Sequence, residues 1–302
     1  MQGNSSKLAA FALAALTGAA LTGAAQAQAP QAAPKPAVDS IMTTRVDSEI
    51  AIDPSGALID YRSETPLPDD VRTSLERQVR AWRFEPVLVE GKPVKAKTRM
   101  RITLASRQLG DERYAVTVDN VTFPSNGSGV LPDAPPSAVT VSSRKIVAPA
   151  YPQGLARAGV GGVVLLYLRL SPDGRVLDAA PVQTSLLNVY GNDRSLAQGV
   201  SALEQATARA ARSWQFNVQV HTDHPSARDL TVSMPVEFQA PGAHETRPGQ
   251  WRTEVRGARR EAAWLRDDAG AQRIGVSDVD SGDVVPLASA FKLASEVQGL
   301  AL

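Results

Sequence analysis

The chain has 302 residues, with 32 basic and 31 acidic side chains; 43% of the residues are hydrophobic and only 5% are aromatic. This composition excludes collagen-like, highly charged disordered and polytopic membrane proteins, and the length suggests about two domains. The sequence contains no cysteine, which excludes disulfides, iron–sulfur clusters, thiolate-bound zinc and thiol nucleophiles. Its three histidines leave little for a histidine-based metal site.

Residues 1–27 have the pattern of a secretory signal peptide. Lys7 precedes an apolar run at residues 8–21, and residues 25–27 (Ala-Gln-Ala) form a small-x-small cleavage site. We therefore expect cleavage after Ala27 and a periplasmic protein. The alternative is an uncleaved anchor in the inner membrane, with the chain facing the periplasm. Because Lys7 is the only charge in this stretch, the mature chain has 31 basic and 31 acidic residues, so we expect no nucleic-acid partner.

Breaks rich in proline and glycine divide the rest of the chain. Residues 28–38 form a Pro/Ala spacer that favours extended polyproline II chain, and residues 123–144 read as an interdomain linker. Between and after them lie a first segment, residues 39–122, and a second segment, residues 145–240. Residues 241–302 form a C-terminal region whose fold the sequence leaves uncertain.

The two segments carry the same order of patterns. In each, an alternating strand leads through a turn containing Pro and Gly into a second alternating strand, which predicts a hairpin. A helix with one apolar stripe follows and ends in Trp-x-Phe, and another alternating strand closes the segment. We therefore expect an α+β fold of two small β-β-α-β units, each an antiparallel sheet with one helix packed on one face. The matching residues are Gly56, Trp82 and Phe84 in the first segment and Gly174, Trp214 and Phe216 in the second.

The second segment also has Tyr-Pro ahead of a short glycine-containing helix. In the order of these motifs, residues 149–240 resemble the C-terminal domain of the TonB family. Residues 46–104 resemble it in part, because the Tyr-Pro pair is missing there. The family motif positions in this chain are Tyr151, Pro152, Gly174, Trp214 and Phe216.

The resemblance implies a non-enzymatic periplasmic domain that takes part in energy-dependent uptake. Its partner would be an outer-membrane TonB-dependent transporter or another envelope protein. In that family the last strand pairs with a short partner peptide, which is a strand addition. Pro235 fits an edge strand because it lacks an N–H group. Carried over by position, the partner-binding edge consists of Leu230, Thr231, Val232, Ser233, Met234, Val236 and Phe238.

The chain departs from the energy transducers of this family in three respects. Its N-terminus has a cleavage site, residues 1–29 contain no histidine that would couple to a proton-driven motor, and the spacer spans only about 34 Å as polyproline II. These departures leave an adaptor as one hypothesis. The alternative is a structural envelope scaffold or a homodimer, in which free edge strands pair with each other and nothing is transported.

We expect no catalytic residues, no metal and no cofactor. The pair His221 and His224 lacks further ligands and reads as a solvated loop. Residues 159–162 are rich in glycine but precede a strand, unlike a dinucleotide-binding loop. Asp69 and Asp70 are interpreted as helix-start residues rather than a catalytic pair.

Two further patterns remain open. Residues 92–107 carry Lys and Arg without any acidic residue, which favours a protective charged edge strand over a basic face for peptidoglycan or lipid. In the C-terminal region, the spacing predicts a hairpin around residues 268–270 and an amphipathic helix over residues 287–297.

Overall fold

The structure is a computed structural model that describes residues 39–110, 113–124, 137–187, 189, 193–240, 242–243, 246–266 and 272–302. The predicted signal peptide and spacer lie outside these residues, as does the centre of the hairpin predicted at 268–270. All described residues belong to one unit of the chain. Among them, no helix has the length and apolar character that a membrane span requires.

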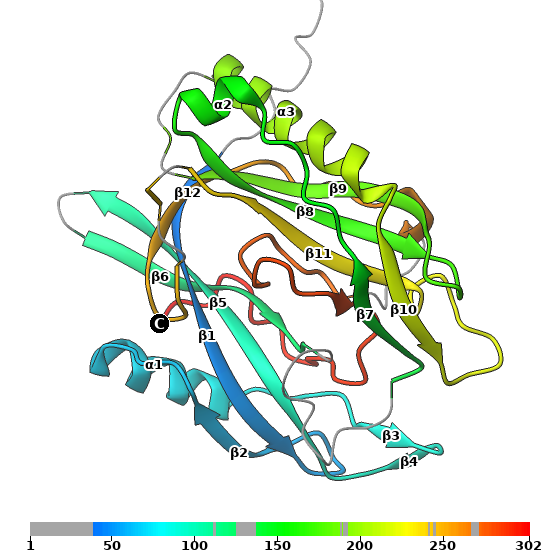
Figure 1. The fold of residues 1–302 in the computed structure, drawn as a ribbon. Coiled ribbons are helices and arrows are strands. Elements are labelled where there is room, and N and C mark those ends of the chain that lie inside the picture. The colour runs from blue at the N-terminus through cyan, green and yellow to red at the C-terminus, as the bar shows by residue number, and fades with distance from the viewer. Residues whose placement is uncertain are drawn as a thin grey trace, which may run out of the picture. The chain divides into compact units, whose positions relative to one another are not determined.

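The strands of both segments join in one antiparallel sheet of nine strands. These are β1 (Asp39–Ile52), β2 (Leu58–Ser63), β5 (Ala96–Gly110), β6 (Arg113–Thr122), β8 (Gly161–Leu170), β9 (Val176–Leu187), β11 (Thr231–Phe238), β12 (Arg252–Arg256) and β13 (Val285–Pro286). Their order is β13-β11-β8-β9-β12-β1-β5-β6, with β2 paired to β1 (Figure 1). Two further pairs are β3 (Leu88–Val89) with β4 (Lys92–Pro93) and β7 (Val139–Lys145) with β10 (Gln215–Val220). The α+β class with antiparallel sheets is confirmed.

Both predicted hairpins form, and each is tied to the Trp-x-Phe exit at its turn. Gly56 and Gly174 have φ angles of 82° and 83°. A Cβ atom would lie 2.0 Å from the Phe84 carbonyl oxygen at Gly56 and 1.8 Å from that of Phe216 at Gly174. The Phe84 and Phe216 N–H groups donate to the carbonyls of these same glycines. Only glycine combines a positive φ with so close an approach of backbone.

The helices that follow the hairpins are α1 (Asp69–Arg80) and α3 (Asp193–Ala211), as the apolar stripes predict. Two shorter elements are α2 (Gln153–Arg157) and the 3-10 turn η1 (Ala263–Leu265). The helix predicted over residues 287–297 is wrong, because the chain there is irregular and extended. Its apolar residues Phe291 and Val297 are buried in the core of the first segment, and its backbone pairs with that segment instead of with itself.

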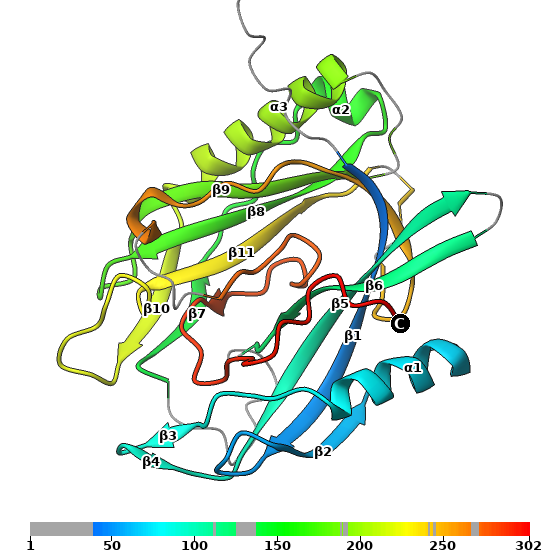
Figure 2. The same ribbon diagram turned by 180° about the vertical axis from the view of Figure 1, so that it is seen from behind.

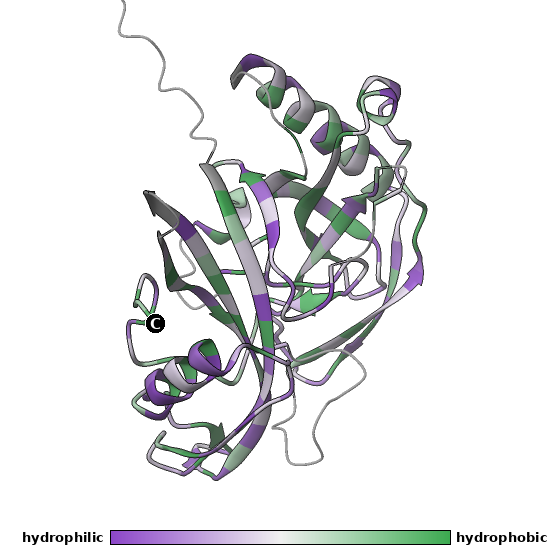
Figure 3. Ribbon diagram, turned by 90° about the vertical axis from the view of Figure 1, so that its left-hand side faces the viewer, coloured by the Kyte–Doolittle hydropathy of each residue, from purple (hydrophilic) through white to green (hydrophobic). Residues whose placement is uncertain are grey.

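Strand β8 is buried on both faces. Its even-numbered apolar residues pack with α3, and its odd-numbered ones pack with residues 262–287 of the C-terminal region. Both hydrophobic and hydrophilic residues occur along the long strands of the sheet (Figure 3), whereas β8 is an almost continuous apolar run, as expected for a strand buried on both faces. The two sets on β8 are Val164, Leu166, Leu168 and Leu170, and Val163, Leu165 and Tyr167.

The end of the linker predicted at residues 123–144 forms a β-strand instead of irregular chain. Residues 139–145 form β7, which pairs with β10, the strand that begins within the Trp-x-Phe exit. Val139 and Val141 are 3% exposed and belong to the core under α3. The Gly/Ser composition of the earlier residues hid this short strand.

Residues 272–302, here called the C-terminal strap, run between the two halves of the sheet (Figures 1 and 2). The strap first adds β13 to β11. It then pairs with residues 83–85, where the Glu85 N–H donates to the Lys292 carbonyl over 2.9 Å. At its end it pairs with β6, where the Val118 N–H donates to the Leu300 carbonyl over 2.9 Å. The strap therefore covers backbone edges in both the first and the second segment.

In the first segment the strap occupies the position that β7 has in the second. Phe216 of β10 faces Ser143 of β7, and the matching Phe84 faces Leu293 of the strap. The two tryptophans differ in their polar partner. Trp214 Nε1 donates to the Val147 carbonyl over 2.8 Å, whereas the buried Trp82 Nε1 has no hydrogen-bond acceptor among the described residues.

Candidate functional site

The predicted partner-binding edge lies on β11, but its outer side is not open. Along its inner side β11 pairs with β8 over all eight residues. On the outer side Val232 faces Pro286 and Ser233 faces Val285 of β13. The strap also donates from the Leu287 N–H to the Thr231 carbonyl at 3.0 Å. The expectation of a free edge is therefore corrected: the chain occupies this part of the edge itself.

The same occupation extends to Pro235, whose carbonyl accepts the Gly282 N–H at 3.2 Å. The side chains of the predicted edge are structural. Thr231, Val232, Ser233, Met234, Val236 and Phe238 are all buried, and Leu230 packs partly buried against the core under α3. Ser233 Oγ donates to the Val285 carbonyl at 3.1 Å, which fixes β13 on this edge. No local pattern predicts this pairing, because β13 lies about fifty residues downstream and has only two residues.

The family motif positions meet in the core of the second segment. Tyr151 packs edge-on against Phe238 with ring centroids 5.3 Å apart, and its hydroxyl donates to the Val160 carbonyl at 2.7 Å. Pro152 immediately precedes α2. Trp214 and Phe216 are each 1% exposed. These residues hold the hairpin, helix and β11 together and present no polar group to a ligand.

A network of charges joins the strap to the polar face of β1 and β5. Arg101 Nε donates to Asp47 Oδ1 at 2.6 Å, and its other nitrogens reach the Asp278 carbonyl and Asp280 Oδ2, each at 3.0 Å. Arg45 also forms an ion pair with Asp280. Burial disfavours the charge on Arg101, but Asp47 and Asp280 raise its pKa overall. Arg101 is therefore a buried structural cation and not part of an exposed basic face.

Asp278 anchors the strap to β5 and β6. Its carboxylate accepts hydrogen bonds from Thr103 Oγ1, Asn120 Nδ2 and the Gly275 N–H. Burial nevertheless raises the pKa of Asp278. A raised pKa in the folded chain means that this group opposes folding more as pH rises through that value, so acidification does not release the strap through Asp278.

Glu254 of β12 is a second buried carboxylate, and it lies where the two halves of the sheet meet. Its Oε1 accepts from Arg256 Nη2 at 2.6 Å, from Arg256 Nε at 3.0 Å and from Ser277 Oγ at 2.7 Å. Its Oε2 accepts no hydrogen bond from the described residues, and the Arg252 guanidinium lies 3.7 Å away. Burial works to raise the pKa of Glu254, but Arg256 and Arg252 lower it overall.

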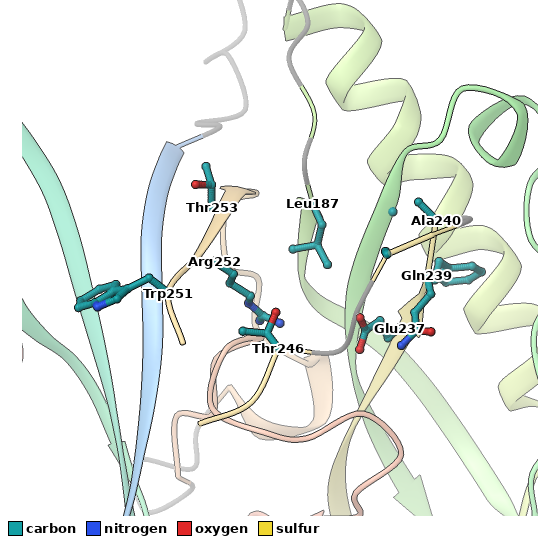
Figure 4. Close-up of a pocket in the computed structure, with 11 residues that line it drawn as sticks. Leu187, Glu237, Gln239, Ala240, Thr246, Trp251, Arg252 and Thr253 are labelled. Atoms are coloured by element: carbon teal, nitrogen blue, oxygen red, sulfur yellow. The ribbon is translucent and has the colours of Figure 1, made fainter. Parts of the chain in front are cut away.

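A cavity of about 290 Å³ opens beside Arg252, at the end of β11 (Figure 4). In the close-up, Arg252 and Leu187 point into it from one side, and Glu237 and Gln239 from the other, around Thr246. Sequence reasoning missed this site. The alternation Arg-Thr-Glu-Val-Arg in β12 was the available signal, since charges that alternate with strand-forming residues mark one polar face. The lining residues are Gly161, Leu187, Glu237, Phe238, Gln239, Ala240, Ala243, Thr246, Trp251, Arg252 and Thr253.

The remaining candidates are not gathered into a site by the described structure. His221 Nε2 lies 3.2 Å from Thr140 Oγ1, and the described residues hold no group of three or more potential metal ligands. Asp69 starts α1 and pairs with Arg72 at 2.6 Å, as expected for a helix-start residue. Asp70 is exposed in the same first turn.

Comparisons with known proteins leave the family open. No family model, no curated protein and no solved structure matches the chain. The TonB-like motif order therefore stays a sequence-based prediction, and the function must be argued from the geometry of the strap, the β11 edge and the cavity.

Proposed function

We propose that the protein is an exported, TonB-like envelope protein that binds an extended segment of another envelope protein by strand addition and has no enzymatic activity. The two segments are interpreted as two copies of one β-β-α-β unit. Support comes from their equal pairing orders, β2-β1-β5 and β9-β8-β11, and from the equivalent contacts at Gly56 and Gly174. The proposed partner is an outer-membrane TonB-dependent transporter, and the proposed location is the periplasm.

The observation that carries this proposal is that the chain already adds its own backbone to the β11 edge. β13 makes only two ladder pairs there. A partner strand that replaced it would offer the same backbone groups to Thr231, Val232 and Ser233. The side chains set a further requirement, because Val285 and Leu287 are buried on the same face of the sheet.

Exposing each of these two side chains costs about 1.5–3 kcal/mol. A partner segment therefore has to bring its own apolar residues at positions i and i+2. Partner binding is then an exchange of one strand for another, and its affinity is the difference between two similar interactions. This predicts weak, reversible binding.

A reversible lock tests the exchange in the full-length chain. The protein has no cysteine, and Ser233 faces Val285 directly, so the double variant S233C/V285C allows one disulfide between β11 and β13. We expect plug-domain peptides of outer-membrane transporters to bind the reduced variant and not the oxidised one. The control lock T140C/Q219C joins the facing pair of β7 and β10 and should leave binding unchanged in both states. Equal binding to both states of the first variant would sink the proposal.

The scaffold or homodimer alternative has one observation in its favour. Among the described residues β2 pairs only with β1, and Ile59 on it is 48% exposed. A second copy pairing along this edge would bury Ile59. Sedimentation of the full chain tests it: a dimer that dissociates in the variant I59K supports pairing through β2, and a monomer at all concentrations excludes it.

A further inference from the structure

The cavity at the end of β11 contains a cation whose hydrogen-bonding capacity is unused. Arg252 is 20% exposed in its side chain and has one ion-pair contact, 3.7 Å from Glu254 Oε2. Within the described part of the chain its guanidinium makes no hydrogen bond. Glu254 is already satisfied on Oε1 by Arg256 and Ser277. Arg252 Nη2 lies 3.7 Å from Glu254 Oε2, and the other N–H donors of Arg252 are available at the cavity wall.

A smaller cavity of about 20 Å³ adjoins the first and shares Thr246 and Arg252 with it. Two of its lining residues, Thr44 and Arg45, have buried polar atoms, Oγ1 and Nε, that make no hydrogen bond to a described residue. This space is about right for one water molecule. The wall between the two cavities is thus polar, and some of its buried polar atoms make no hydrogen bond to a described residue.

The charges around this wall are mainly positive. Arg45, Arg247 and Arg252 line the smaller cavity, and Arg45 is partly neutralised by Asp280. Burial, and then the charge of Arg101, lower the pKa of Arg45, which reflects crowding of positive charge in a poorly solvated place.

The opposite side of the larger cavity has a different character. Glu237 and Gln239 line it, together with the apolar side chains of Leu187 and Phe238. Glu237 has an interaction of its own, so it is counted here only as a negative charge that keeps a second anion away. A ligand with one carboxylate, an apolar body and a cationic or amide end matches this order of groups.

We propose that the cavity binds a small peptide through its C-terminal carboxylate, with Arg252 as the recognition residue and the peptide side chain against Leu187. The volume of about 290 Å³ limits the ligand to about dipeptide size. A guanidinium can hold a carboxylate with two parallel N–H···O bonds, and Thr246 and Thr253 line the same cavity. Glu237 and Phe238 of β11 line this site, beyond Val232 and Ser233 that pair with β13, and binding there does not depend on strand addition.

The test is an NMR titration of the full-length chain with the dipeptide alanyl-leucine and, separately, with its C-terminal amide. We expect the free acid to shift the backbone amides of Thr246, Arg252 and Thr253 with a Kd of about 1 mM or tighter. The amide, which lacks the carboxylate, should bind at least roughly tenfold more weakly. Equal shifts by both compounds, or none by either, overturn the proposal, whatever any variant does.

Variants then locate the contact. R252Q should weaken binding of the acid by roughly tenfold or more, and R252K should recover part of it. The matched control is R62Q, since Arg62 is an exposed arginine on β2 with a side chain 67% exposed, and it should bind as the wild type does. Undiminished binding by a folded R252Q chain would assign Arg252 to neutralising Glu254 alone and overturn the proposal. If R252Q does not fold, the comparison of acid and amide on the wild-type chain still decides.

Discussion

The strap should be an integral part of the first segment, and the substitution F291A tests this most directly. Phe291 is 4% exposed and lies in the core with α1, β1 and β5. Its ring centroid is 6.0 Å from that of Phe123, which in turn lies 6.1 Å from Phe84 in an edge-on arrangement. The strap thus contributes Phe291 to a group of three aromatic rings in the core of the first segment.

Replacing a buried phenylalanine by alanine costs about 3–5 kcal/mol when the surroundings cannot relax. Phe291 lies in an irregular stretch of the strap that can shift into part of the space, so we expect the lower end, about 3 kcal/mol. The loss also removes part of the favourable contact between rings, about 0.5–1.5 kcal/mol, which is included in that value. The control is L88A, because Leu88 lies in the first segment, whose core contains Phe291, but is itself 59% exposed. That control should change stability by less than about 0.5 kcal/mol.

Urea denaturation followed by tryptophan fluorescence measures the free energy of unfolding. Hydrogen exchange then shows where the loss occurs, because the amides of Glu85 and Val118 donate directly to strap carbonyls. We expect these two amides to lose protection in F291A before the amides of β8 do. A loss of stability below about 1 kcal/mol with unchanged exchange would show that the strap only rests on the first segment and does not share its core.

Two further predictions use matched groups. In E254Q the loss of stability should be constant at neutral pH and should shrink as pH falls below about 4.5. The pKa of Glu254 is lowered in the folded chain, so the stability that Glu254 contributes is present above its ordinary pKa and is lost as pH falls through the folded-state pKa. Unfolding measurements at several pH values check this prediction, and a pH-independent difference contradicts it. W214F should lose about 1 kcal/mol more stability than W82F, because Trp214 loses its hydrogen bond to the Val147 carbonyl whereas Trp82 has no acceptor to lose. Thermal unfolding of both variants tests this, and equal losses of stability would refute a stabilising role for the Trp214 hydrogen bond.

Local structure followed from sequence wherever the signal was local. The hairpin turns at Gly56 and Gly174, both long helices and the burial of Trp82 and Trp214 were predictable, because turn chemistry and a helical stripe act within a few residues. The same reasoning interpreted Phe291 as one face of a helix. Its spacing is compatible with a helix. In the structure, however, the strap forms backbone hydrogen bonds with residues 83–85 and not within a helix.

The site was less predictable than the fold. That β11 is a strand could be read from its alternation, but the occupation of its edge could not, because β13 is two residues long and distant in sequence. Arg252 and Glu254 lie in a strand of five residues that joins both halves of the sheet. Burial of Glu254 depends on Arg256, Ser277 and the strap, and contacts between segments so far apart leave no periodic signal.

The strap covers both ends of the main sheet. The sheet order begins with β13, which is itself part of the strap, and ends with β6, which the last strap residues cover through Val118 and Leu300. Exposed sheet edges invite uncontrolled pairing, so one segment protects both. Between these ends the strap passes through Phe291 in the core of the first segment. A partner that displaces β13 from β11 therefore pulls on a segment anchored in the other half of the molecule, and on the proposed function such binding is coupled to the stability of the first segment.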